Sequence, residues 1–200
     1  QVSHGFVSME IQTASVMGRE FSRPLLAQVM GWPESDLDQA CRALHAREFV
    51  YEAAVYPDTL FAFKHALTQE VAYHSLLQES RAELHAAVGA AIETLYADKL
   101  QEYVTTLAYH YSRSASTHKA EHYLYAAGLR SGELYADTDA QHFWEEHLAL
   151  LETMPHSPER DQLEVRTRLH LMTLLSRQSN DDSHIQAHFA QAETACLRLE

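Results

Sequence analysis

The fold of this chain is decided by the stretch Phe61-Ala-Phe-Lys-His65-Ala-Leu-Thr-Gln-Glu-Val-Ala-Tyr73-His-Ser-Leu-Leu77. Its first residues alternate as in a half-buried strand, and a helical pattern begins at His65. A histidine therefore stands at a strand-to-helix junction, where the first backbone N–H groups of the helix lack an intrahelical acceptor. Such a junction is suited to a phosphate oxygen or another anion.

The residues before this stretch predict three short helices and a β-hairpin. We expect the helices at about 7–17, 22–30 and 33–47, from their apolar spacing and from Ser22 and Gly31 as cap and stop. Residues 19–21 are expected to be a connector. Two runs rich in aromatic and β-branched residues flank Pro57-Asp58, which is typical of a turn. Three helices followed by a hairpin is the order of a winged helix-turn-helix domain, which we predict for residues 1–78.

The chain after Lys64 has helical patterning, so the predicted fold class is mainly α, and residues 79–200 predict an array of helices. We expect helices at about 65–77, 81–98, 100–112, 118–135, 137–153, 160–177 and 183–200. Gly128, Ala140 and Trp144 have the spacing of a tetratricopeptide (TPR) repeat, in which small residues let antiparallel helices cross closely. His147 stands where such a repeat has a small residue, so an ordinary α-hairpin remains the alternative to a TPR-like array.

Composition and charge restrict the class of protein. The 200 residues are 46% hydrophobic, which is enough for a globular core. Asp and Glu outnumber Lys and Arg by 28 to 15, and the net charge of −13 disfavours nucleic acid and anionic lipid as partners. No apolar run is long enough to span a membrane, and the first residues show no secretion signal. Because the sequence does not begin with Met, we expect it to be a piece of a longer protein. Cys41 and Cys196 form no disulfide framework, and a reducing cytoplasm is the expected location.

The sequence contains no motif of the common catalytic classes. The GxxxxGK[ST] phosphate-binding loop is absent, as are GxSxG, HExxH and the nucleophilic-cysteine signatures. Two HxxxH pairs, His118/His122 and His184/His188, each place two imidazoles on one helix face, as zinc ligands require. Neither pair has a third acidic ligand in a recognisable motif, and such pairs arise by chance among 14 histidines. We therefore predict neither a metal site nor an enzymatic activity for this chain.

A winged helix raises the question of DNA binding. The recognition helix would be 33–47, and its first turns carry Glu34, Asp36 and Asp38. DNA-binding helices need donors and cations there, facing phosphates and base edges. Carboxylates in a first turn are instead explained by favourable interaction with the helix dipole. We do not expect this chain to bind DNA.

Several segments resemble one protein family. They are Ile11-Gln-Thr-Ala-Ser-Val-Met-Gly-Arg-Glu-Phe21 with the following Pro24-Leu-Leu and Trp32-Pro-Glu34; the stretch from Phe63 to Leu77; Leu84-His85 and Leu95-Tyr96-Ala-Asp98; Leu150-Leu-Glu-Thr-Met-Pro155; and Ala192-Glu-Thr-Ala-Cys-Leu-Arg-Leu199. Together they resemble the region after the ATPase core in STAND-type regulatory ATPases. These include predicted ATPases fused to class III adenylate or guanylate cyclases, and LuxR-type large transcriptional regulators.

The resemblance implies a role for the strand-to-helix junction. In related signalling ATPases a winged-helix histidine contacts the β-phosphate of bound ADP and holds a closed, inactive form. By motif position that histidine is His65, and Lys64 beside it would add a cation. The alternative is a satisfied junction histidine that caps the hairpin, with Lys64 facing solvent. His74 and residues 78–80 stand where the family is often more basic, which weakens the case for an anionic partner at this helix pair.

The resemblance also implies a function. The chain would be a regulatory fragment of a signalling ATPase, with the winged helix as a nucleotide-state lid and the repeats as a sensor for a protein or small-molecule effector. The chain itself would hold no cofactor, because ADP or ATP would bind to the upstream ATPase core in cis in the full-length protein. Neither nucleic acid nor a membrane is an expected partner. The alternative is a stand-alone TPR-type protein-interaction scaffold without a nucleotide role.

Overall fold

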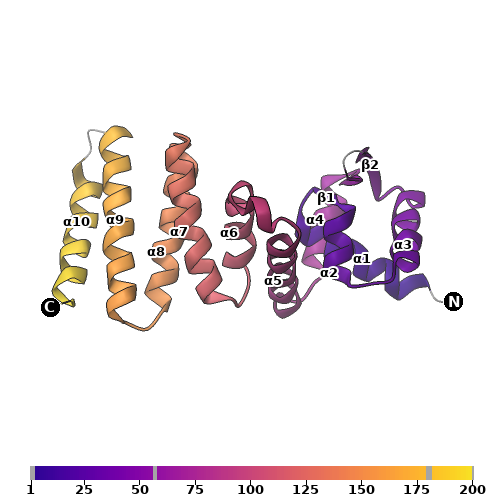
Figure 1. Cartoon of the computed structure of the whole chain (residues 1–200), viewed down its shortest axis with the longest axis horizontal. Coiled ribbons are helices and arrows are strands. Elements are labelled where there is room, and N and C mark those ends of the chain that lie inside the picture. The colour runs from indigo at the N-terminus through magenta and orange to yellow at the C-terminus, as the bar shows by residue number, and fades with distance from the viewer. Residues whose placement is uncertain (1–2, 56–57, 179–181, 200) are drawn as a thin grey trace. The chain divides into compact units, whose positions relative to one another are not determined.

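The computed structural model describes residues 3–55, 58–178 and 182–199, with the side chains of 9–55, 58–178 and 183–199. Within these residues the protein is mainly helical and carries one three-stranded antiparallel sheet (Figure 1). The chain divides into two compact units, which we describe separately. Unit 1 comprises residues 1–100 with 113–115, and unit 2 comprises 101–112 with 116–200. The mainly α fold class predicted from the sequence is confirmed.

Unit 1 contains three helices before the hairpin and two after it. Its elements are α1 (Ser3–Met17), β1 (Glu20–Ser22), α2 (Arg23–Met30), α3 (Glu34–Ala46), β2 (Val50–Ala54), β3 (Leu60–Phe63), α4 (Ala66–His74) and α5 (Gln78–Leu95), followed by the 3₁₀ segment η1 (Ala97–Glu102). The predicted caps of α2 are confirmed. Ser22 Oγ accepts a hydrogen bond from the Leu25 amide at 3.3 Å, and Gly31 ends the helix with a φ of 61°.

The sheet differs from the predicted hairpin by one strand. The prediction of a connector at 19–21 is wrong, because residues 20–22 form β1, which pairs antiparallel with β3 and places Phe21 opposite Phe61. The strand order is β1-β3-β2, so β3 is central. A strand of three residues has too few positions to show periodicity, and its hydrogen-bonding partner lies about forty residues further along the chain. The predicted turn at Pro57-Asp58 falls partly outside the described residues, since Pro57 is one of those left out.

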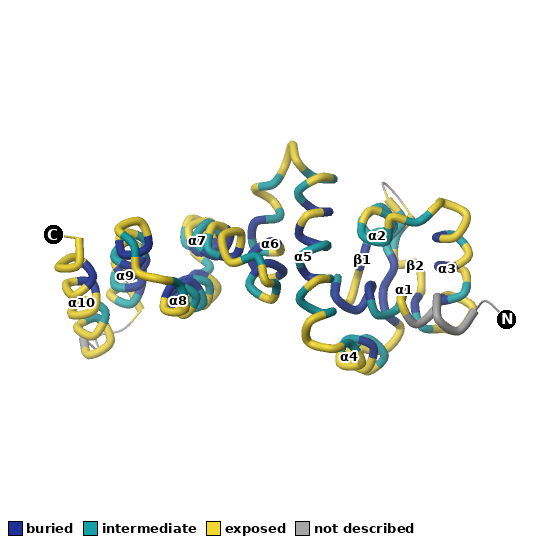
Figure 2. The backbone as a smooth tube through the Cα atoms, turned by 90° about the horizontal axis from the view of Figure 1, so that it is seen from below, coloured by how far each residue is buried: buried dark blue, intermediate teal, exposed yellow. Residues whose placement is uncertain are grey.

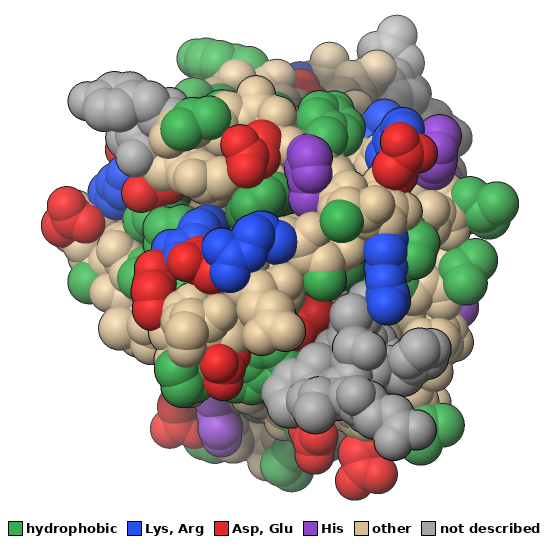
Figure 3. Space-filling model, turned by 90° about the vertical axis from the view of Figure 1, so that its right-hand side faces the viewer, with side chains coloured by type: hydrophobic (Ala, Val, Ile, Leu, Met, Phe, Trp, Pro, Cys, Tyr) green, Lys and Arg blue, Asp and Glu red, His purple; other side chains and the backbone are tan. Residues whose placement is uncertain are grey.

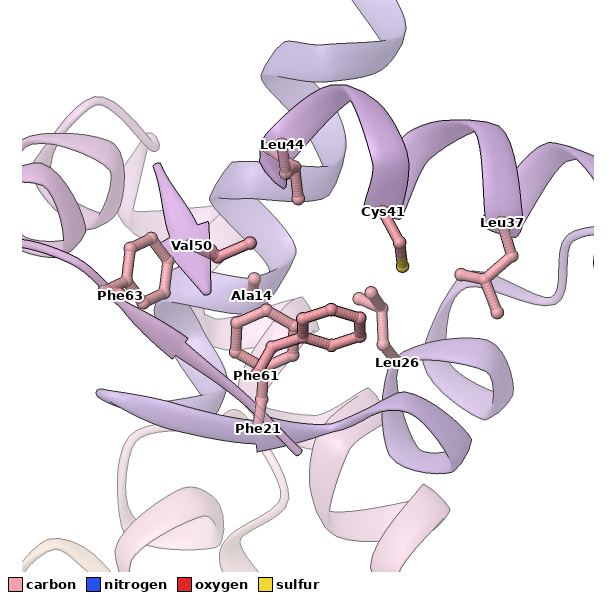
Figure 4. Packing of buried hydrophobic residues seen from close by; sticks show 9 residues of the cluster. All are labelled: Ala14, Phe21, Leu26, Leu37, Cys41, Leu44, Val50, Phe61 and Phe63. Atoms are coloured by element: carbon pink, nitrogen blue, oxygen red, sulfur yellow. The ribbon is translucent and has the colours of Figure 1, made fainter. Parts of the chain in front are cut away.

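The core of unit 1 lies between the sheet and the first three helices. Figure 4 shows its residues, Ala14, Phe21, Leu26, Leu37, Cys41, Leu44, Val50, Phe61 and Phe63, which come from α1, α2, α3 and all three strands. The Phe21 ring lies 5.7 Å from the Phe61 ring and 5.8 Å from the Phe63 ring, centroid to centroid. Aromatic rings at this separation add attraction beyond the burial of their area. The inward-facing phenylalanines of β3 therefore hold the start of α4 in place.

Unit 2 is built from helices that follow one another through short connections. They are α6 (Val104–Ser112), α7 (Thr117–Glu133), α8 (Asp137–Thr153), α9 (Pro158–Gln178) and α10 (Asp182–Leu197). Each helix packs beside the next, and Figure 2 marks the buried residues along these helices in dark blue. The connection expected between the helices at 160–177 and 183–200 includes residues 179–181, which lie outside the described residues.

The close approach expected at Gly128 is present between α7 and α8. A Cβ atom at this glycine would lie 2.2 Å from Trp144 Nε1 and 2.4 Å from Trp144 Cδ1. Only a residue without a side chain fits there, because ordinary contacts are near 3.5–4.0 Å. Ala140 is fully buried in the same contact and belongs to the cluster that Trp144 forms with leucines of α8 and α9.

The compact units divide the chain later than the domain boundary predicted after residue 78. Helix α5 packs on α1 and α2, so it belongs to unit 1. The assignment of residues 1–78 and 79–200 to two domain families stays a prediction. Among the described residues, no helix has both the length and the apolar character that crossing a membrane requires.

Candidate functional site

The candidate site is the junction between β3 and α4, where His65 is the N-cap residue of the helix. Its backbone is extended, with a φ of −131° and a ψ of 131°, and its side chain makes no capping hydrogen bond. The side chain is exposed, whereas Phe63 two residues earlier is buried. The amide of Phe63 donates to the Arg19 carbonyl at 3.0 Å, and that of Lys64 donates to the Phe49 carbonyl at 2.9 Å. The sheet thus holds the backbone while the imidazole stays in solvent.

The first turn of α4 carries no acidic residue. The Thr68 amide donates to the His65 carbonyl at 3.0 Å, while the amides of Ala66 and Leu67 lie before the first intrahelical acceptor. The helix dipole adds a partial positive charge at this end. In contrast, the first turn of α3 carries Glu34 and Asp36. Of these two helix starts, that of α4 is the one chemically suited to an anion.

Lys64 is exposed but paired. Its Nζ lies 3.0 Å from Glu48 Oε2, and the hydrogen bond from this ammonium lowers the pKa of Glu48 below its ordinary value, with a smaller contribution from His65. Glu48 follows the C-terminal end of α3 and has a φ of 57°, which turns the chain into β2. Sequence reasoning missed this carboxylate, since nothing in the spacing of residues 48 and 64 indicates that they meet. The cation predicted beside His65 is therefore already partly neutralised.

Side chains on both sides anchor α4 to its neighbours. Gln69 Nε2 donates to the Ser15 carbonyl of α1 at 2.8 Å, and the Tyr73 hydroxyl lies 3.1 Å from Nε2 of His85 on α5. The Arg81 guanidinium lies over the Tyr73 ring, 5.2 Å from its centroid. Burial, and then the charges of Arg113 and Arg81, lower the pKa of His85 to about 4, so this imidazole is neutral near pH 7. The junction thus sits on a fixed helix.

The histidine pairs considered as zinc ligands have no third ligand among the described side chains. Within the part of the chain that the structure describes, no three His, Cys, Asp or Glu side chains are grouped so as to hold a metal. His188 Nδ1 lies 3.4 Å from Nη1 of Arg168. The pKa of His188 is lowered mainly by burial and to a smaller extent by the charge of Arg168. His118 and His122 are both exposed.

The acidic first turn of α3 has a structural partner. Arg23 Nη2 lies 2.5 Å from Glu34 Oε1 and 2.6 Å from Asp38 Oδ1, so one guanidinium joins α2 to α3. Figure 3 shows that, on the face it presents, Lys and Arg side chains are interspersed with Asp and Glu. On this face the described cations do not form the continuous row that tracks a nucleic-acid backbone.

Sequence reasoning also missed a group of buried charges in unit 2. Arg160, Asp161, Glu164 and Arg168 lie on α9, and each is less than 10% exposed. Their spacing contained a signal, because Arg160/Glu164 and Glu164/Arg168 are i, i+4 pairs that face each other on a helix. Burial could not be read from that spacing, since the same pairs are common on solvated helix faces.

Comparison of the chain with protein-family models, curated proteins and solved structures gives no significant match.

Proposed function

We propose that this chain is a regulatory, non-catalytic segment of a cytoplasmic signalling ATPase. In this proposal residues 1–78 act as a winged-helix lid over a nucleotide held by an upstream ATPase core, and residues 79–200 act as a TPR-like sensor for a protein or small-molecule effector. The observation that carries the proposal is the geometry of His65. An exposed imidazole that takes no part in capping stands at a helix start without acidic residues. That combination is suited to a phosphate oxygen.

The order of elements in unit 1 supports the winged-helix assignment. The element order is α1-β1-α2-α3-β2-β3. In this proposal α2 and α3, joined through Gly31 to Pro33, are the helix-turn-helix, and the β2–β3 hairpin is the wing. Strand β1 completes the sheet against the hairpin, and the junction at His65 follows the wing directly. A lid needs a rigid mount for its contact residue, and the hydrogen bonds from α4 to α1 and α5 supply one.

Contacts in unit 2 support a TPR-like arrangement. Gly128 and Trp144 provide the small residue and the groove-filling aromatic that such repeats use between their two helices. The Tyr125 hydroxyl of α7 lies 3.2 Å from His170 Nε2 of α9. The first helix of the α7–α8 pair therefore contacts the first helix of the α9–α10 pair. Trp144 stacks on the same His170 at 5.0 Å. Stacked helix pairs of this kind present extended surfaces for partners.

The proposed mechanism is a shift between a closed and an open lid. With ADP on the core, the His65 imidazole would donate a hydrogen bond to a phosphate oxygen, and the amides of Ala66 and Leu67 would face the same charge. An effector on the repeats could open the lid only if it binds the open state more tightly than the closed one. Phosphoryl chemistry would belong to the core, because this chain contains no phosphate-binding loop.

The test is ADP retention by the protein that carries the ATPase core. We expect His65→Ala to speed ADP release by about tenfold or more, as for loss of one charge-assisted hydrogen bond. His74→Ala is the matched control, since His74 is an exposed histidine in the last turn of the same helix. Unchanged ADP release in the His65 variant would contradict the proposal.

A scaffold without a nucleotide role is the second candidate. The pairing of Lys64 with Glu48 favours it, because it removes one of the two cations that a phosphate site would use. A scaffold predicts that partner binding is intact in both histidine variants and that ADP has no effect on it. The nucleotide-lid proposal predicts that ADP weakens partner binding and that His65→Ala abolishes this coupling.

A further inference from the structure

Few apolar side chains of helix α10 are buried. Of its residues with described side chains, 183–197, only Ala192 and Ala195 are buried. Of its large apolar side chains, Ile185 is half-buried, whereas Phe189 is 58% and Leu197 64% exposed. Figure 2 shows α10 as mostly exposed or half-buried. Two alanine methyl groups contribute little to docking.

Several polar contacts join α9 to α10. We call Arg160, Asp161, Glu164, Arg168 and Arg198 the ionic clasp. Arg198, directly after α10, reaches Asp161 at 3.2 Å and Glu164 at 2.8 Å. A second contact is donated from α9 to α10: the Arg168 guanidinium donates a hydrogen bond to Gln191 Oε1 at 2.5 Å.

The clasp is balanced within α9 as well as across to α10. Glu164 accepts from Arg160 at 2.5 Å and from Arg168 at 2.8 Å, so its charge is compensated by its own helix. Arg160 also donates through Nε to the Leu151 carbonyl at 3.0 Å, which ties the clasp to the end of α8. If α10 left, Asp161 and Glu164 would lose Arg198 as a partner. Both carboxylates would still be paired with arginines of α9. Buried ion pairs of this kind give little net stability, although breaking one is costly when a charge is left unpaired.

Farther along α9, beyond the ionic clasp, apolar residues pack against α8. Leu171 and Leu174 are fully buried and belong to the cluster with Ala140, Trp144 and Leu148. This cluster contains no residue of α10. The packing of α9 on α8 therefore does not depend on α10.

From these contacts we infer that α10 is a detachable helix, docked on α9 by the ionic clasp and able to leave while α8 and α9 stay packed. This inference is independent of the proposed nucleotide role. Local opening of this kind occurs where few apolar contacts hold an element. When α10 leaves, a row of charges on α9 formed by Asp161, Glu164 and Arg168 becomes accessible, and the remaining helices keep their core.

Amide hydrogen exchange on the whole chain tests this inference. In the wild type, α10 amides should exchange faster than those of α8 by about tenfold or more. Arg198→Gln should speed exchange in α10 by about tenfold again and leave α8 unchanged. Arg177→Gln is the matched control, because Arg177 lies on α9 and makes an exposed pair with Asp137 at 3.3 Å. It should change α10 exchange by less than about twofold.

Two results would overturn the inference. One is a common exchange rate for α8 and α10, because that would show a single cooperative unit. The other is unchanged α10 exchange in the Arg198 variant. Phe189→Ser provides a second check, since this side chain is exposed and should not affect docking. Faster α10 exchange in that variant would show that apolar contacts, not the clasp, hold the helix.

Discussion

Two glycines on α7 are expected to respond in opposite ways to the same substitution. Gly128 and Gly132 are one turn apart and both face the Trp144 indole. A Cβ atom at position 128 would lie 2.2 Å from the ring, whereas one at position 132 would lie 3.4 Å away, in ordinary contact. Replacing either glycine by alanine increases helix propensity by about 1 kcal/mol. Only the change at position 128 forces the helices apart.

The magnitude follows from these distances. Bringing the Cβ of Gly128→Ala to about 3.5 Å requires a local opening of about 1.3 Å in a packed contact, which costs about 3 kcal/mol at the upper end of overpacking effects. After the propensity gain, Gly128→Ala should lower the free energy of unfolding by about 2 kcal/mol. Gly132→Ala should raise it by up to about 1 kcal/mol. The expected difference between the two variants is therefore about 3 kcal/mol.

Urea unfolding followed by circular dichroism and tryptophan fluorescence measures this difference. The chain has two tryptophans, so a Trp32→Phe background makes Trp144 the reporter of the affected contact. Trp144→Phe should lessen the cost of Gly128→Ala, because the smaller ring leaves room for the added methyl group. Equal stability of the two alanine variants would refute the reasoning.

Two buried titratable groups in unit 1 predict opposite pH effects. Glu10 is 1% exposed, and its Oε2 has no hydrogen-bond partner among the described residues. Burial raises the pKa of Glu10 from 4.5 to about 7. Unit 1 should therefore lose stability as the pH rises from about 4.5 to about 7. Glu10→Gln should remove that loss, as measured by urea midpoints across the pH range, and an unchanged pH slope would contradict the assignment. The lowered pKa of His85 acts in the other direction: stability should fall by up to roughly 3 kcal/mol as the pH drops from about 6.5 to about 4. His85→Gln should flatten this acid limb, and an identical acid limb in that variant would show that other groups cause it.

Much of unit 1 was predictable because its signals are local. The ends of α2 follow from Ser22 and Gly31, each of which acts within its own helical turn. The strand at residues 20–22 was missed because its hydrogen bonds go to β3, far along the chain. The same reason applies at the candidate site. His65 was placed correctly at the helix start, while the pairing of Lys64 with Glu48 depends on how α3 and β3 meet.

By itself the sequence determined the succession of helices, the place of the hairpin, the junction at His65 and the close crossing of two helices at Gly128. Each depends on residue types at short or regular spacing, which backbone geometry converts directly into structure. Only the tertiary structure decided which charges are buried and what they meet. The clasp brings Arg198 to Asp161 across 37 positions, a contact that exists only once α9 and α10 have packed. Periodicity indicates which face of a helix is apolar, but it does not tell a solvated row of charges from one that holds a neighbouring helix.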